Sequence, residues 1–252
     1  MKIKQIKKVK SKYEVIIEEE VFLVEPQTLI YFNLHKNKEI TKARLIEIIN
    51  FDEKQVIFNK AIKYLKTQKT TLDFKKYLFS LNVEARYIYQ LVDEFTKKGY
   101  LNDDLFVVNY LNKYEKKYAL KRIEEQLLNK GINKDLIDKH ISKKDNTFFE
   151  EHLKNIISKT KKGNLYQTKQ AVLRKMVSLG YDLKETEKRL NNLNIKVDED
   201  EALLKELNKL KTKYTNKYDP KEVNFKIKQA LYRKGFNKEI IDKYLMEDSN
   251  DF

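Results

Sequence analysis

The sequence predicts a mainly α-helical protein made of tandem repeats, with a small β-rich module at its N-terminus. A phrase consisting of a helix, a glycine and a second helix recurs along the chain, which is typical of a repeat architecture. Only five glycines and two prolines occur among 252 residues, so the loops must be short and the helices many. The first 40 residues differ from the rest because they are rich in β-branched and aromatic side chains, which favour strands.

The β-rich module is expected to hold two or three strands of a small antiparallel sheet within residues 1 to about 40. The strand candidates are Lys12–Glu20 and Val21–Leu34, and Pro26 interrupts the second of them. Thr41 is then expected to cap a helix that runs through Ile49.

The clearest copy of the repeated phrase runs from Ile123 to Ile141. Apolar residues at helical spacing line one face of its first helix. Gly131 fits the position after a helix end, where φ is positive and a Cβ would clash. Asn133 is a suitable N-cap for the helix that follows.

Three further copies of the phrase have their stops at Asn82, Gly180 and Gly235. Asparagine is, after glycine, the residue that most readily adopts a left-handed backbone. The stops at positions 82, 131, 180 and 235 are separated by 49, 49 and 55 residues. A period of this size indicates stacked helical units, each too small to bury its apolar face alone.

Local signals mark the helices of the first two repeats. Thr70 and Asp73 form a capping box for the second helix of repeat 1. Two lysines followed by Gly99 end its third helix, as the helix dipole favours. Asp103 is expected to cap the next helix, Leu105–Tyr114, which opens repeat 2.

Repeat 3 opens near Phe148, and its basic loop covers residues 159–164. Repeat 4 has a long first helix with an apolar face that includes Leu203 and Tyr214. Its last residues, 247–252, are expected to form a short disordered tail. The predicted division is therefore a β-rich module (1–51), repeat 1 (52–103), repeat 2 (104–147), repeat 3 (148–197), and repeat 4 with the tail (198–252).

The formal net charge of +15 predicts electrostatic attraction to nucleic acid or to a nucleoprotein surface. Six of the 53 basic residues are arginines, so 47 are lysines. Lysine suits phosphate as a mobile point charge, whereas bidentate reading of bases prefers arginine, so sequence-specific DNA recognition is disfavoured. The alternative is a compositional bias of the chain toward Lys, Asn, Ile and Tyr.

Basic residues recur on the predicted second helix of every repeat and could form a continuous positive strip. For Lys130 and Lys234 a structural explanation is strong, because any helix favours a cation just before its glycine stop. For the others, the alternative is an ordinary lysine-rich surface. The candidate binding residues are Lys75, Lys76, Lys121, Arg122, Lys130, Lys169, Arg174, Lys175, Lys226, Lys228, Arg233 and Lys234. The candidate structural positions of the repeats are Asn82, Gly99, Asp103, Gly131, Gly180 and Gly235.

Several function classes lack support in the sequence. Cysteine is absent, which excludes disulfides, thiolate zinc sites and a cysteine nucleophile. No phosphate-binding glycine loop occurs, and His35, His140 and His152 are isolated, so we expect no enzyme activity, cofactor or metal. No apolar run approaches about 18 residues, and the basic N-terminus lacks the features of a secretory signal, so no membrane association is expected.

A nuclease site is the one catalytic alternative that could be assembled. Asp103 and Asp104, together with Glu115 and Lys117, contain the residue types of a two-metal nuclease. They lie along a predicted helix rather than together at a strand edge, and helix caps explain them better.

The chain resembles the RecX family, the modulators of the RecA recombinase. The matching residues are Ala61, Tyr64 and Leu65 in repeat 1, the run Gly99-Tyr-Leu-Asn-Asp103 followed by Phe106 and Tyr110, the run Leu127-Leu-Asn-Lys-Gly131-Ile, and its later counterpart Leu231-Tyr-Arg-Lys-Gly235-Phe. The resemblance covers about residues 55 to 246, and the β-rich leader followed by four units is similar to the longer members of that family.

The resemblance implies tandem three-helix units in an elongated, curved array that binds in the groove of a RecA–DNA filament. It implies modulation, mainly inhibition, of ATP hydrolysis and strand exchange by RecA, and thus a place in DNA repair, homologous recombination and the SOS response. We expect a cytoplasmic monomer whose partners are the RecA filament and, weakly and without sequence preference, single- or double-stranded DNA. The alternative is a free-standing, nonspecific nucleic-acid-binding repeat protein.

Overall fold

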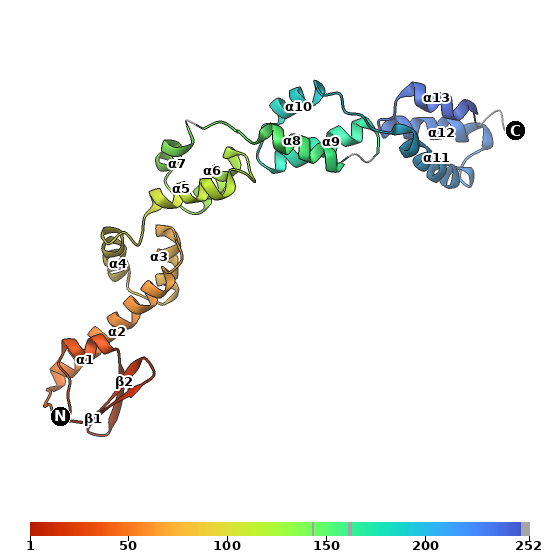
Figure 1. Cartoon of the computed structure of the whole chain (residues 1–252). Coiled ribbons are helices and arrows are strands. Elements are labelled where there is room, and N and C mark those ends of the chain that lie inside the picture. Colours follow the sequence, from red (N-terminus) through yellow and green to blue (C-terminus); the bar gives the residue numbers. More distant parts are fainter. Residues whose placement is uncertain (143, 161–162, 248–252) are drawn as a thin grey trace. The chain divides into compact units, whose positions relative to one another are not determined.

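The computed structural model describes residues 1–142, 144–160 and 163–247. Over these ranges the chain is mainly helical, with one three-stranded antiparallel sheet near the N-terminus, as predicted (Figure 1). Most of the predicted C-terminal tail, residues 248–252, lies outside the described residues, as do residues 161 and 162 of the basic loop.

The contacts within the chain group it into two compact units. One comprises Met1–Val108 together with Leu128–Leu136, and the other comprises Asn109–Leu127 together with the chain from Ile137 onward. The glycine stop of repeat 2 thus belongs to the unit that contains repeat 1. The division of the chain into five modules stays a prediction.

The N-terminal sheet has the strand order β1-β2-β3, with β1 Ile3–Val9, β2 Lys12–Ile17 and β3 Glu20–Val24. Both strand pairs are antiparallel. The two connections are tight, with Lys10 and Glu18 at positive φ, each 54°. Alternate side chains of β2 are buried, which agrees with a sheet that has one face on a core.

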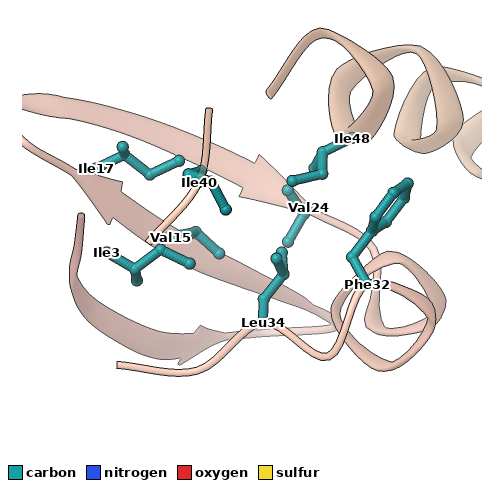
Figure 2. Close-up of a cluster of buried hydrophobic side chains, with 8 residues drawn as sticks. All are labelled: Ile3, Val15, Ile17, Val24, Phe32, Leu34, Ile40 and Ile48. Carbon is teal, nitrogen blue, oxygen red and sulfur yellow. The ribbon is translucent and has the colours of Figure 1, made fainter. Parts of the chain in front are cut away.

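One face of the sheet packs against the following segment in a single apolar cluster (Figure 2). Val15, Ile17 and Val24 come from the sheet, and Ile48 comes from a helix of the first repeat. The remaining members of the cluster are Ile3, Phe32, Leu34 and Ile40. The module therefore has its own hydrophobic core and shares it with the start of the helical region.

The expectation of a strand across residues 21–34 is wrong after Val24. Residues Pro26–Tyr31 form the helix α1, which begins at Pro26. Proline favours the first helical position because its fixed φ suits the helix and its missing N–H would have no partner there. The β-branched and aromatic residues that follow Pro26 were outweighed by this start signal.

The helix that begins after Thr41 is longer than expected. Thr41 caps it as predicted, since its side chain accepts a hydrogen bond from the N–H of Arg44 at 3.1 Å. The end expected near Ile49 is wrong, because the helix α2 runs without interruption through Lys42–Tyr64. The predicted boundary between residues 51 and 52 consequently lies inside α2.

The remaining helices follow the predicted trios, with α2 as the first helix of repeat 1. Their bounds are α3 Thr71–Ser80, α4 Ala85–Lys97, α5 Asp103–Tyr114, α6 Leu120–Asn129, α7 Lys134–Ile141, α8 Phe149–Thr160, α9 Leu165–Ser178, α10 Leu183–Asn191, α11 Glu199–Thr215, α12 Pro220–Arg233 and α13 Lys238–Glu247. Buried residues recur at helical spacing, as for Leu203, Leu207 and Leu210 on α11.

The backbone at the helix stops adopts the expected left-handed conformation. Asn82 has a φ of 56°, and Gly131, Gly180 and Gly235 have φ values of 77°, 96° and 84°. Gly99, after the third helix of repeat 1, has a φ of 78°.

Besides Thr41, two of the predicted N-caps are confirmed and one is wrong. The side chain of Thr70 accepts from the N–H of Asp73 at 3.1 Å, and that of Asn133 accepts from the N–H of Asp135 at 2.8 Å. Asp103 does not cap α5, because Asn102 accepts from the N–H of Leu105 at 2.9 Å in that role.

Neighbouring repeats are joined by a contact that recurs three times. In each case, the carbonyl oxygen of the residue before a glycine stop accepts a hydrogen bond. The donor is the residue just before the second helix of the preceding repeat. Thr70 Oγ1 donates to the carbonyl of Lys130 at 3.0 Å. The N–H of Ala119 donates to the carbonyl of Leu179 at 2.9 Å. A lone carbonyl at a helix C-terminus thereby gains a partner from another repeat.

The third of these joints connects repeats 3 and 4. Asn164 Nδ2 donates to the carbonyl of Lys234 at 2.9 Å, while Asn164 Oδ1 accepts from the N–H of Gln167 at 2.8 Å. Asn164 is fully buried. One side chain therefore caps α9 and holds the end of α12.

A second recurring contact caps the starts of the same helices from a residue at the start of, or a few residues before, the helix that opens the next trio (α5, α8 and α11). The first N–H of α3, at Thr71, donates to Asp103 Oδ1 at 2.9 Å. The first N–H of α6 donates to Asn146 Oδ1 at 3.0 Å, and that of α9 donates to Glu199 Oε1 at 2.6 Å. A carboxylate or amide oxygen satisfies an N–H at the positive end of the helix dipole. Asp103 thus caps α3 instead of α5.

Candidate nucleic-acid interface

The predicted basic residues lie where the sequence placed them, on or directly after the second helix of each repeat. These helices are α3, α6, α9 and α12. Their surroundings differ enough to separate residues that hold the fold from residues that face solvent.

Arg122 takes part in the joint between repeats 2 and 3. Its Nη1 donates to the carbonyl of Ser178, and its guanidinium lies 5.0 Å from the centroid of the Tyr118 ring. A Cβ placed on Gly180 would come within 2.5 Å of Arg122 Cβ and 2.9 Å of its backbone nitrogen. The side chain of Arg122 is therefore occupied in packing one repeat on the next.

Lys228 and Lys234 are paired with carboxylates. Lys228 forms a salt bridge with Asp242, and Lys234 forms one with Glu206. The hydrogen bond to Lys234 lowers the pKa of Glu206, despite the opposing effect of burial, so this carboxylate is ionised at neutral pH. Lys130 Nζ lies 5.9 Å from the centroid of Phe106. Lys130 and Lys234 thus have contacts within the fold in addition to their position before a glycine stop.

Three other candidates contact neighbouring polar or aromatic groups. Lys75 Nζ lies 5.0 Å from the Tyr89 ring centroid. Lys169 Nζ donates to Asn191 Oδ1 at 3.2 Å, and Lys175 Nζ donates to Thr160 Oγ1 at 3.1 Å. Exposed interactions of this kind contribute little to stability, so these lysines can exchange them for a ligand.

Of the remaining five candidates, four are exposed and one is half-buried over an aromatic ring. The exposed ones are Lys76 on α3, Lys121 on α6, Arg174 on α9 and Arg233 on α12. Lys226 Nζ lies 5.5 Å from the ring centroid of Tyr218. Every second helix thus presents at least one exposed cation.

The strongest concentration of cations lines a groove of about 530 Å³ between α11 and α12. We call it the α11–α12 groove. Its lining residues are Glu206, Lys209, Leu210, Lys213, Tyr214, Tyr218, Lys226, Gln229, Ala230, Arg233 and Lys234. Five cationic side chains therefore surround a single carboxylate, Glu206, which pairs with Lys209 at 3.2 Å as well as with Lys234. The excess of positive charge, carried by Lys213, Lys226 and Arg233, favours an anionic ligand.

Two tyrosines add aromatic surface to the α11–α12 groove. The rings of Tyr214 and Tyr218 meet edge to face, with centroids 5.3 Å apart. Tyr214 also packs against the apolar core of repeat 4. Lys213 Nζ lies 5.7 Å from the Tyr214 centroid, and Lys217 Nζ lies 5.8 Å from the Tyr218 centroid.

Comparison with known proteins finds relatives that match nearly the whole chain. The family model described as RecX, third three-helix domain, matches residues 198–245. A regulatory protein RecX from Streptococcus mutans is 31% identical, with 98% of this chain and 99% of that protein covered. The chain belongs to the RecX family. A regulatory protein RecX from Streptococcus gordonii is 27% identical over 98% of this chain and 99% of its own length.

A solved structure supports the fold assignment. The crystal structure of a regulatory protein RecX aligns with a TM-score of 0.57 and 18% identity. The alignment covers 76% of this chain and 99% of that one. The predicted fold class is therefore confirmed. The similarity to the streptococcal proteins confirms the sequence-based recognition of the RecX family, and with it a regulatory role.

The sequence analysis of this RecX-family chain missed part of the α11–α12 groove. Lys209, Lys213 and Tyr218 line it but were not among the candidates, and Tyr214 was considered only as a core residue. A signal was present, because the pattern Lys-Tyr-x-x-Lys-Tyr occurs at residues 113–118 and again at 213–218. Both copies lie where the first helix of a RecX repeat ends.

Two acidic residues of the nuclease alternative have structural roles in this RecX-family chain. Asp103 accepts from the backbone of Thr71, and Glu115 forms a salt bridge with Lys144 at 2.7 Å. Among the described residues, no group of three or more His, Cys, Asp or Glu side chains could hold a metal ion. Within the same part of the chain, none of the helices is both long and apolar enough to span a membrane.

Proposed function

We propose that this protein modulates, and mainly inhibits, the RecA recombinase. It would bind in the groove of the RecA–DNA filament through the cations of its second helices and thereby alter ATP hydrolysis and strand exchange. The observation that carries the proposal is membership of the RecX family, shown by similarity along nearly the whole chain. We further expect a monomer that acts in the cytoplasm.

The recurring joints support this proposal because the same kinds of hydrogen bond are formed at the starts of α3, α6 and α9. The same two contacts recur between repeats 1 and 2, 2 and 3, and 3 and 4. A partner with its own repeated structure, such as a filament, can then be contacted at several points by one chain.

Weak contacts made by several repeats reinforce one another through effective concentration. Once one repeat is bound, the next binds as an intramolecular event, so several weak contacts together give a strong one. Exposed cations supply a salt-sensitive attraction to phosphate and to acidic protein surface. Occupation of the filament groove would exclude a second DNA or change the packing of RecA subunits.

The test is a titration of the chain into RecA filaments on single-stranded DNA, with ATP turnover as the readout. We expect turnover to fall at amounts stoichiometric with the filament. The variant Lys76→Glu/Lys121→Glu/Arg174→Glu/Arg233→Glu reverses one exposed cation on each second helix and should require a much higher concentration.

The matched control reverses four exposed lysines on first or third helices, Lys60, Lys154, Lys184 and Lys205. It changes the net charge by the same amount and should resemble the unmodified chain. Unchanged ATP turnover at stoichiometric amounts of the unmodified chain would defeat the proposal.

The competing function is nonspecific nucleic-acid binding that needs no RecA. The α11–α12 groove is the observation that favours it. Binding to naked DNA as strong as binding to the filament, with a steep salt dependence, would support this alternative.

A further inference from the structure

We propose that the α11–α12 groove is a binding site for single-stranded nucleic acid, with a base stacked on Tyr218 and phosphates held by the cations of the two groove walls. This inference goes beyond RecA modulation and deepens the competing function, because it names the type of strand and the role of each group. It assigns a ligand class to a particular set of residues in repeat 4.

The cations form two rows that face the same groove. Lys209 and Lys213 are one turn apart on α11, and Lys226 and Arg233 are two turns apart on α12. At a rise of about 1.5 Å per residue, the row on α12 extends for about 10 Å. A backbone with a regular series of phosphates can contact both rows along its length, whereas a compact anion could satisfy only one end.

The aromatic pair supplies the surface on which a base can stack. Tyr214 is fixed by the core of repeat 4, and its ring meets that of Tyr218 edge to face. Lys217 and Lys226 currently lie near the Tyr218 ring. An exposed cation–aromatic contact contributes about 0.5–1 kcal/mol, whereas stacking of a base contributes about 1–3 kcal/mol. A base can therefore replace one of these ammonium groups, which becomes available to a phosphate.

The combination of groups favours a single strand over other polyanions. A duplex stacks its bases on each other and offers only phosphates to the lysines. An acidic peptide likewise uses the cations but leaves the aromatic ring without a flat partner. Lysine rows interleaved with tyrosine are the composition that binds single strands without sequence preference.

A related cluster of tyrosines and lysines, with a different ring geometry, occurs a second time in the chain. In repeat 2, Tyr114 lies 4.4 Å from Tyr110 and 6.1 Å from Tyr118, measured between ring centroids. Lys113 and Lys117 lie 5.1 Å and 6.0 Å from the Tyr114 centroid. The Lys-Tyr-x-x-Lys-Tyr pattern thus gives an aromatic cluster beside lysines at the equivalent point of two repeats.

The experiment compares two labelled strands by fluorescence anisotropy without RecA. One is an oligothymidylate of about 12 nucleotides, within the usual range of single-strand sites, and the other is an abasic strand with the same number of phosphates. The full chain should bind the oligothymidylate about fivefold or more tightly, the factor expected from one stacked base.

Two sets of variants separate stacking from charge. Tyr218→Leu should remove most of the preference for bases, and Tyr218→Phe should keep it. Lys213→Ala/Lys226→Ala/Arg233→Ala should weaken binding to both strands and reduce the salt slope by about 2. The control Lys154→Ala/Lys184→Ala/Lys205→Ala should leave the preference intact, and the thermal unfolding of each variant checks its fold.

Photocrosslinking locates the contact, because the repeat 2 cluster remains in all of these variants. A strand that carries 5-iodouracil should crosslink to Tyr218. Equal affinity for the two strands, an unchanged preference in Tyr218→Leu, or crosslinks only outside the groove would overturn the inference. So would a duplex or polyglutamate that competes as well as the oligothymidylate. A negative result in this assay does not change the result expected from the RecA titration. A negative RecA titration likewise does not change the result expected here.

Discussion

The amide nitrogen of Asn164 donates a hydrogen bond of 2.9 Å to the carbonyl oxygen of Lys234, although 70 residues separate them. This bond joins the beginning of the second helix of repeat 3 to the end of the second helix of repeat 4. Equivalent bonds join Thr70 to Lys130 and Ala119 to Leu179. Because the bonds use positions next to the glycine stops, the stops have two functions: they end a helix and they form a joint.

The two functions of a glycine stop can be separated by substitution. Gly99 has a positive φ but open space around it, whereas a Cβ at Gly180 would meet the backbone nitrogen of Arg122 at 2.9 Å. Gly99→Ala should lower the free energy of unfolding by about 1–2 kcal/mol, the cost of a left-handed alanine. Gly180→Ala should lower it further, because backbone atoms of another repeat must also move. Urea unfolding measures the loss of unfolding free energy in both variants. Equal losses would contradict the claim that Gly180 forms a joint between repeats.

The two hydrogen bonds of Asn164 can be removed one at a time. Asn164→Asp keeps the oxygen that caps α9 but loses the N–H that reaches Lys234, so we expect a loss of about 1 kcal/mol. Asn164→Ala loses both bonds at a buried position and should lower the free energy of unfolding by about 2–3 kcal/mol. If Asn164→Asp is as stable as the unmodified chain in chemical denaturation, the bond between the repeats contributes nothing.

The buried carboxylate of Asp52 connects the N-terminal module to α2. Its Oδ1 accepts from the N–H of Glu25 at 2.7 Å and from Thr28 Oγ1 at 2.6 Å. Asp52→Ala should destabilise the module by about 2–4 kcal/mol, because two buried donors lose their acceptor. Asp52→Asn retains an acceptor oxygen and should cost less. Hydrogen exchange of the β2 amides reports the effect, and protection unchanged in Asp52→Ala would refute it.

Alkaline pH should reveal the burial of Tyr181. Burial raises the pKa of its hydroxyl from 10.0 to about 12. The folded protein therefore holds this proton more tightly than the unfolded chain. The resulting contribution to stability is complete below pH 10 and is lost as the pH rises to about 12.

The comparison with Tyr181→Phe isolates this effect from the lysines that titrate in the same range. The difference in unfolding free energy between the unmodified chain and the variant should shrink by about 1–3 kcal/mol between pH 9 and pH 12. At neutral pH the variant also loses the contact of 2.7 Å between the hydroxyl and His152 Nδ1. Parallel pH profiles for the two proteins would show that the hydroxyl is not held in its neutral form.

Local signals in the sequence were sufficient for much of the fold. The caps at Thr41, Thr70 and Asn133 could be predicted because each involves atoms two or three residues apart. Asp103 was misassigned because its hydrogen bond goes to Thr71, and a contact between repeats leaves no short-range pattern. The continuity of α2 was missed because a new repeat was expected to start near Asp52. No glycine or proline interrupts residues 42–64, and the helix continues from the sheet module into the first repeat.

The candidate site was predicted only in part. The second helices do carry the expected cations, but Lys209 and Lys213 on α11 became candidates only when α11 was seen to face α12. Conversely, Arg122 is held between repeats 2 and 3 by Ser178 and Gly180. The charge of a residue is visible in the sequence, whereas its partners depend on which helices pack together.

The most direct test of the central proposal is a cryo-electron microscopy map of the chain mixed with RecA filaments on single-stranded DNA. We expect helical density along the filament groove, with α3, α6, α9 and α12 toward the RecA–DNA surface. Bare filaments at saturating amounts of the chain, or density with these four helices facing solvent, would contradict the account.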